Sequence, residues 1–188
     1  MLKRKEILVQ LLDDPDSDVS SAAAAALEKI EAMLGVDEIL EQLKSGGLVE
    51  KVRAIYALGE TGGEKVLKPL VYCASRPEVE LKGAAIDALG MVAHRSTIPA
   101  LLEKLKDENS GIRARAIRAI GQFKDSSLTP SLLPFLEAGD GLTDAEAALA
   151  LAACGDPSLE PLLVKLASSP VPQARAAAAT ALAMLRPA

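Results

Sequence analysis

The sequence predicts an all-α solenoid in which six copies of one two-helix unit stack end to end. Two alanine positions return every 31 residues, and this period nearly fills the 188-residue chain. They are Ala23, Ala54, Ala85, Ala116, Ala147 and Ala178, and three residues later Ala26, Ala57, Ala88, Ala119, Ala150 and Ala181. Aromatic residues make up only 2% of the chain, so alanine and leucine must form a core of closely packed helices. We expect one domain, with repeats at about 2–32, 33–63, 64–94, 95–125, 126–156 and 157–187.

The two helices of a unit are clearest in residues 95–125. The first begins at Ser96 or Thr97, carries Pro99 in its first turn, and repeats its apolar residues at helical spacing as far as Leu105. A polar turn, 106–111, separates it from a second helix that starts near Ile112. In-phase prolines mark the same first helix in the next two units. In unit two, Val49 and Val52 are displaced from the pattern, so we expect its second helix to begin or rotate differently.

The second helices also carry a family resemblance. The run 112–121 and its counterparts 81–90 and 174–183, with the junction 154–163, resemble HEAT-like repeats of the phycobilisome-lyase type. The resemblance covers the whole chain and implies a right-handed superhelix of antiparallel helix pairs. It does not imply one function, because the family includes scaffolds, lyase subunits and a metal hydroxylase.

Residues for catalysis or metal binding are missing from the sequence. His94 is the single histidine, so the paired His-Glu motifs of the metal hydroxylase have no match, and we expect it to be a solvated or capping side chain. No nucleotide-binding or nucleophile motif is present, and the in-phase glycines Gly59, Gly90 and Gly121 indicate helix packing or capping. We therefore predict a protein that is not an enzyme and that needs no cofactor or metal. Cys73 and Cys154 are expected to be reduced packing residues.

Most charged residues fit a structural role. The aspartates between positions 13 and 18 lack the glycine and glutamate of a calcium loop, so we expect them to cap the following helix. Lys51, Lys82, Arg113 and Arg175 share one repeat position, which predicts a ladder of pairings along the stack. The unit 95–125 has seven basic and four acidic residues, but residues 1–63 have seven basic and twelve acidic ones. One basic patch on a chain of net charge −5 makes nucleic acid an unexpected partner.

No segment is long and apolar enough to cross a membrane, and the charged start does not resemble a signal peptide. We therefore expect a cytoplasmic protein that does not bind membranes.

The non-repeating residues of the second helices are the candidate site, because packing fixes the others. On the expected concave surface we predict partner binding by Arg53, Tyr56, Glu60, Asp87, Met91, Arg115, Arg118, Gln122, Leu149 and Met184. The leading hypothesis is an adaptor that binds a protein segment, with acidic residues opposite Arg115 and Arg118 and an apolar side against Leu149 and Met184. The alternative, which comes from the resemblance alone, is a non-catalytic or lyase-like subunit acting on a tetrapyrrole-linked protein. A homodimer joined through the uncapped C-terminal repeat is compatible with either.

Overall fold

The computed structural model describes residues 2–185, which form helices joined by short turns, with no β-strand in that range. The first helices are α1 (Leu2–Leu11), α2 (Ser17–Ser45), α3 (Leu48–Thr61), α4 (Glu64–Ala74) and α5 (Val79–Val92). They are followed by α6 (Ile98–Lys104), α7 (Ser110–Gly121), α8 (Thr129–Leu132), α9 (Thr143–Cys154), α10 (Glu160–Leu166) and α11 (Pro172–Met184). Short 3₁₀ helices cover Arg95–Thr97, Ser126–Leu128, Leu133–Glu137 and Pro157–Leu159.

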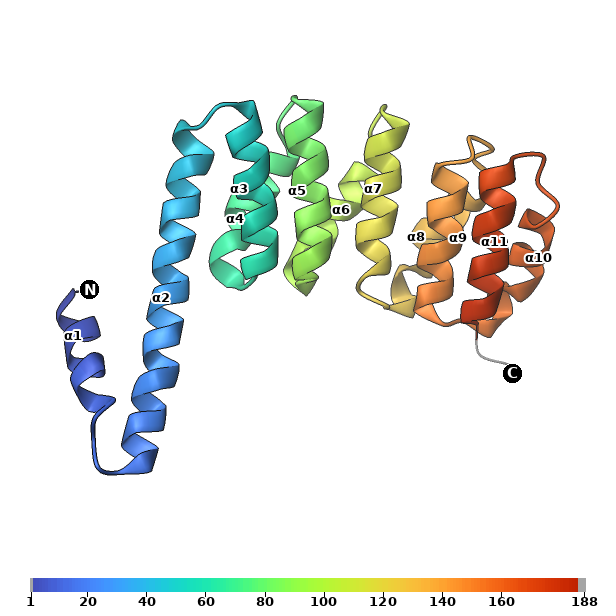
Figure 1. The fold of residues 1–188 in the computed structure, drawn as a ribbon. Coiled ribbons are helices and arrows are strands. Elements are labelled where there is room, and N and C mark those ends of the chain that lie inside the picture. The colour runs from blue at the N-terminus through green and yellow to red at the C-terminus, as the bar shows by residue number, and fades with distance from the viewer. Residues whose placement is uncertain (1, 186–188) are drawn as a thin grey trace.

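The helices form two rows, as an α-solenoid requires (Figure 1). The second helices of successive units, α3, α5, α7, α9 and α11, pack on one another in chain order, and we call them the B helices. The shorter helices α4, α6, α8 and α10 form the other row. The predicted all-α repeat architecture is confirmed.

Alanine makes the close packing of the B helices possible. All six alanines of the first in-phase series are buried, and the core extends continuously from Val36 to Ala181. A side-chain carbon built at Gly90 would lie 2.9 Å from both Cα and Cβ of Ala119, and Gly59 and Gly121 meet Ala88 and Ala150 in the same way. The in-phase glycines are therefore packing positions, where neighbouring helices touch backbone to backbone.

The first two units differ from the predicted pattern. The expected boundary near residue 32 lies inside the continuous helix α2. At the other junctions the chain turns at a residue with a positive φ angle, and these residues are spaced 31 positions apart. They are Gly62, Ala93, Lys124 and Gly155. Residues 28–36 contain no proline and only one glycine, so the chain there has no strong helix-breaking signal. As a result α1 and the N-terminal half of α2 project beyond the stack (Figure 1).

The irregularity expected in the second helix of unit two is not observed. Helix α3 begins at Leu48, in register with the starts of α5 at Val79 and α7 at Ser110. Val49 is exposed near the start of this helix, while Val52 packs against the core. The displaced valines therefore change which side chains lie on the surface of α3, but not where the helix begins.

No helix between residues 2 and 185 combines the length and the apolar character needed to span a membrane.

Candidate functional site

The predicted site residues lie along the B helices, on the surface that we call the B-helix face. The side chains of Arg53, Glu60, Met91, Arg118, Gln122 and Met184 are exposed, whereas Tyr56, Asp87, Arg115 and Leu149 are half-buried. Leu149 also packs against the core, so it contributes less exposed apolar surface than the sequence indicates.

Three of these residues form one polar cluster across α3, α5 and α7. The hydroxyl of Tyr56 donates a hydrogen bond of 3.1 Å to Oδ2 of Asp87. Nη1 of Arg115 donates to the same oxygen, and its side chain lies over Gly83. The cluster thus ties three consecutive B helices together at one carboxylate.

Arg118 has its own partner. Its guanidinium binds Glu146 of α9 through two hydrogen bonds, of which the one from Nε to Oε2 is 3.1 Å long. These hydrogen bonds raise the pKa of Arg118 above its ordinary value. The expected basic centre of the face is therefore neutralised within the protein, because Arg115 and Arg118 face Asp87 and Glu146. Acidic residues of a partner opposite Arg115 and Arg118 remain a prediction, and they would meet arginines that already have carboxylate partners in this chain.

The sequence spacing of these ion pairs is related to the 31-residue period and could have predicted them. Asp87 and Arg115, as well as Arg118 and Glu146, are 28 residues apart. Two pairs in the first helices of units, Asp37 with Lys65 and Glu137 with Lys165, have the same spacing. In neighbouring helices that run parallel, a residue one turn before the equivalent position faces the original side chain. Oppositely charged residues that are 28 positions apart, three fewer than the repeat length, therefore predict contacts between neighbouring units.

One depression of the B-helix face has apolar walls. It has a volume of about 690 Å³, lies between the first turns of α3, α5 and α7, and is called the apolar hollow here. Leu48, Val49 and Val79 line it with largely exposed side chains, and Val49 is 59% exposed. The polar part of its lining includes Arg53, Tyr56 and Arg115, together with Glu80 and Asn109. Of all these residues, the sequence prediction included only Arg53, Tyr56 and Arg115.

A smaller depression of about 320 Å³ lies farther along α5 and α7. Its lining includes Met91 and Gln122 together with Asp87 and Arg118. Seven of the ten candidates thus line one or the other of these two depressions, while Glu60, Leu149 and Met184 line neither of them.

The predicted ladder is formed in part. Nζ of Lys82 lies 2.8 Å from Oδ2 of Asp107, and Nη2 of Arg113 lies 3.8 Å from Oδ2 of Asp140. Arg175 instead donates to the carbonyl oxygens of Ser169 and Pro170. At the second helix of the first unit, Asp16 accepts hydrogen bonds from the backbone N–H groups of Asp18 and Val19. The capping role expected for this acidic segment is thereby observed.

His94 and the cysteines have structural surroundings. Nδ1 of His94 accepts a hydrogen bond of 3.3 Å from the backbone N–H of Ser96, so this residue caps the following 3₁₀ helix. Cys73 and Cys154 are free thiols. Within the described part of the chain, no three His, Cys, Asp or Glu side chains are grouped so that they could hold a metal ion.

Comparisons with known proteins support the repeat assignment. A family model described as HEAT repeats matches residues 67–142 and 129–188. No curated protein sequence matches significantly. The complex of CpcE and CpcF of phycocyanin lyase from Nostoc sp. resembles the structure with a TM-score of 0.68 and 23% identity. The match covers 80% of this chain and 64% of the matched chain of that complex.

An engineered protein is similar over 98% of this chain and 96% of its own, with a TM-score of 0.54 and 22% identity. At such low identity, both likenesses indicate the fold alone. The family model, in contrast, spans more than half of the sequence. The chain therefore belongs to the HEAT repeat family.

Proposed function

We propose that the protein is a non-enzymatic scaffold that binds a segment of another protein on its B-helix face. The observation that carries the proposal is the apolar hollow, where Leu48, Val49 and Val79 expose large apolar side chains around one depression. A contiguous exposed apolar surface with a polar rim is typical of a protein-binding site.

The polar residues beside the hollow support binding rather than catalysis. Tyr56, Asp87 and Arg115 are engaged with one another, which holds their side chains in fixed positions. A preorganised rim of this kind reduces the entropy lost on association. The proposed segment therefore inserts apolar side chains into the hollow and meets Arg53 and Arg115 at its polar border.

Val49→Lys tests this proposal directly. The substitution places a charge at the hollow, and because Val49 is 59% exposed, the stability of the fold should change by no more than about 0.5 kcal/mol. Val164→Lys is the matched control, since Val164 is 53% exposed but lies on α10 in the other row. Arg118 is a poorer probe, because its substitution would also break the pair with Glu146.

The measurement is crosslinked capture from a lysate of the source organism with wild type and both variants. We expect a protein that is recovered by wild type and by Val164→Lys but strongly depleted with Val49→Lys. Equal recovery with all three would contradict binding at the apolar hollow. A melting curve of each variant shows that the fold is retained.

The second candidate is a subunit that acts on a tetrapyrrole-linked protein. Its support is the fold likeness to the CpcE–CpcF complex of phycocyanin lyase. The test is the visible absorption spectrum of a bilin incubated with the protein. A shifted chromophore band favours this candidate, whereas an unshifted band counts against it.

A further inference from the structure

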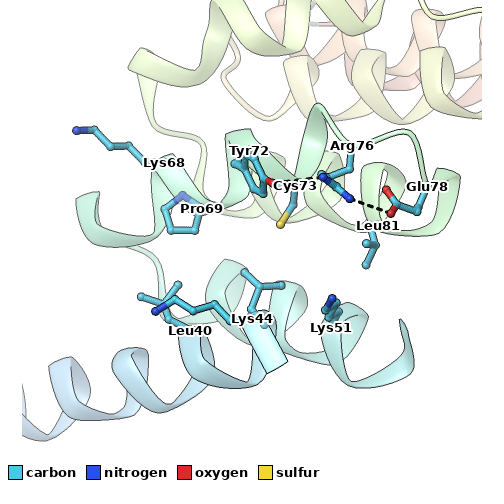
Figure 2. Close-up of a pocket in the computed structure, with 11 residues that line it drawn as sticks. Leu40, Lys44, Lys51, Lys68, Pro69, Tyr72, Cys73, Arg76, Glu78 and Leu81 are labelled. Atoms are coloured by element: carbon cyan, nitrogen blue, oxygen red, sulfur yellow. Dashed lines mark hydrogen bonds and ion pairs between the residues drawn. The ribbon is translucent and has the colours of Figure 1, made fainter. Parts of the chain in front are cut away.

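A third hollow lies away from the B-helix face, where the end of α2 and the start of α3 meet α4 (Figure 2). It has a volume of about 610 Å³, within the usual range for small-molecule sites, and we call it the basic hollow. Its apolar lining includes Leu40, Leu43, Pro69 and Leu81. The thiol of Cys73 faces into it and is almost fully buried.

Positive charge dominates the lining of the basic hollow. Four cations, from Lys44, Lys51, Lys68 and Arg76, line it with a single carboxylate, that of Glu78. Lys44 is paired with Glu41, and Arg76 is paired with Glu78. Lys51 and Lys68 have no such partner among the described residues, and Figure 2 shows the ammonium group of Lys68 pointing away from the hollow.

Lys51 departs from the ladder that its repeat position forms elsewhere. The equivalent residues Lys82 and Arg113 lie near Asp107 and Asp140. Among the described residues, no carboxylate lies within ion-pair distance of Lys51, which is half-buried. Partial burial of an unpaired ammonium group is unfavourable, and an anion bound beside it would offset that cost.

Glu78 supplies the one carboxylate among the residues that line the hollow. Its Oε1 accepts a hydrogen bond of 3.1 Å from Arg76, while its Oε2 is buried and has no hydrogen-bond partner. Arg76 lies over the ring of Tyr72, with its Cζ 5.8 Å from the ring centroid, and holds this aromatic wall in place. Figure 2 shows Arg76, Glu78 and Lys51 toward one end of the basic hollow, whereas α2 supplies both Leu40 and Lys44 toward the other.

We propose that the basic hollow binds a small amphipathic carboxylate, with its acid group at Lys51 and its apolar body against Leu40, Leu43 and Leu81. Charge complementarity selects the acid group, and the apolar lining selects a chain or ring of modest size over a polar anion. This site is separate from the apolar hollow, with which it shares no lining residue.

Decanoate is the probe, and decanol is its uncharged counterpart of equal chain length. Isothermal titration calorimetry should detect decanoate binding to the wild type and at least about tenfold weaker binding of decanol. Equal affinities for the two would overturn the role of the acid group, and no heat of binding with decanoate would overturn the site.

Lys51→Gln should weaken decanoate binding about tenfold. Its matched control is Lys82→Gln, at the same position one repeat later, where the ammonium group binds Asp107. This control should leave the affinity unchanged. Equal affinities of wild type and Lys51→Gln would overturn the proposal, and circular dichroism of both variants shows that they are folded.

Alkylation by iodoacetamide locates the ligand. Burial raises the pKa of the Cys73 thiol, so the reaction is run in mildly alkaline buffer. Decanoate should slow the alkylation of Cys73 more than that of Cys154, which lies at the end of α9. Equal slowing at both cysteines would place the ligand elsewhere and overturn the assignment.

Discussion

At the scale of single residues, small side chains determine how closely the repeats approach. Glycine within a helix ordinarily destabilises it relative to alanine by about 0.5–1 kcal/mol. In this protein three in-phase glycines contact alanines of the next B helix, so the usual preference is reversed at these positions. The effect of a glycine substitution therefore depends on the neighbouring helix.

Gly90→Ala should lower the free energy of unfolding by about 1–3 kcal/mol, because the new methyl group would overlap Ala119 of α7. Gly35→Ala is the control, since a side-chain carbon at Gly35 meets no atom within 4 Å outside its own helix. That variant should be about 0.5–1 kcal/mol more stable than wild type. Urea unfolding measures both changes, and stabilisation by Gly90→Ala would mean that the two helices pack less closely than the structure indicates.

At the scale of helices and turns, the sequence predicts most elements because the same signals recur. Pro99 and Pro161 occupy the first turns of α6 and α10, as expected from their phase. The fused helix α2 could not be predicted by extending the period, since the repeat places a boundary there but residues 28–36 carry no strong breaking signal. Local helix propensity prevails where few tertiary contacts oppose it.

The candidate site was predicted less completely than the fold. Periodicity identifies the B-helix residues that do not recur, but it did not reveal that Arg115 and Arg118 have carboxylate partners 28 residues away in the same chain. The apolar hollow was missed because Leu48 and Val79 share one repeat position and resemble framework residues. Their exposure depends on how far neighbouring helices diverge, which a single repeat does not encode.

Asp107, an aspartate in the turn between α6 and α7, makes the stability of the fold depend on pH. Burial alone would raise the pKa of Asp107, but hydrogen bonds from Lys82 and from the backbone N–H of Asn109 outweigh it, so the pKa lies below its ordinary value. A carboxylate with a lowered pKa stabilises the fold fully above its unfolded value of about 4. This contribution is lost as the pH falls through the folded pKa.

Asp107→Asn should therefore lower the free energy of unfolding by about 1 kcal/mol at about pH 7 and by less at about pH 3. Urea unfolding at both pH values provides the measurement. The control is Glu103→Gln, which removes an exposed carboxylate from the neighbouring helix α6 and should change stability little at either pH. A deficit of Asp107→Asn that is equally large at low pH would assign its effect to packing rather than charge.

At the scale of the whole molecule, stability is distributed unevenly along the array. Each unit of a solenoid contacts chiefly its neighbours, so a unit with fewer contacts is less stable than the rest. Among the side chains that the structure describes, Val36 in the C-terminal half of α2 is the first member of the buried core cluster. Before it, α1 packs chiefly on α2, and Ile7, Val9 and Leu12 remain largely exposed.

Native-state hydrogen exchange should consequently differ in rate between the first unit and the middle of the array. We expect the backbone amides of α1 to exchange orders of magnitude faster than those of α5 and α7, which have neighbours on both sides. Helix α11 is the informative comparison, because it is also terminal but packs closely on α9 and α10. If terminal position alone controlled protection, α1 and α11 would exchange alike. Slower exchange in α11 than in α1 would show that the number of tertiary contacts determines protection. The first unit, which projects and has fewer contacts, would then unfold locally before the rest of the array.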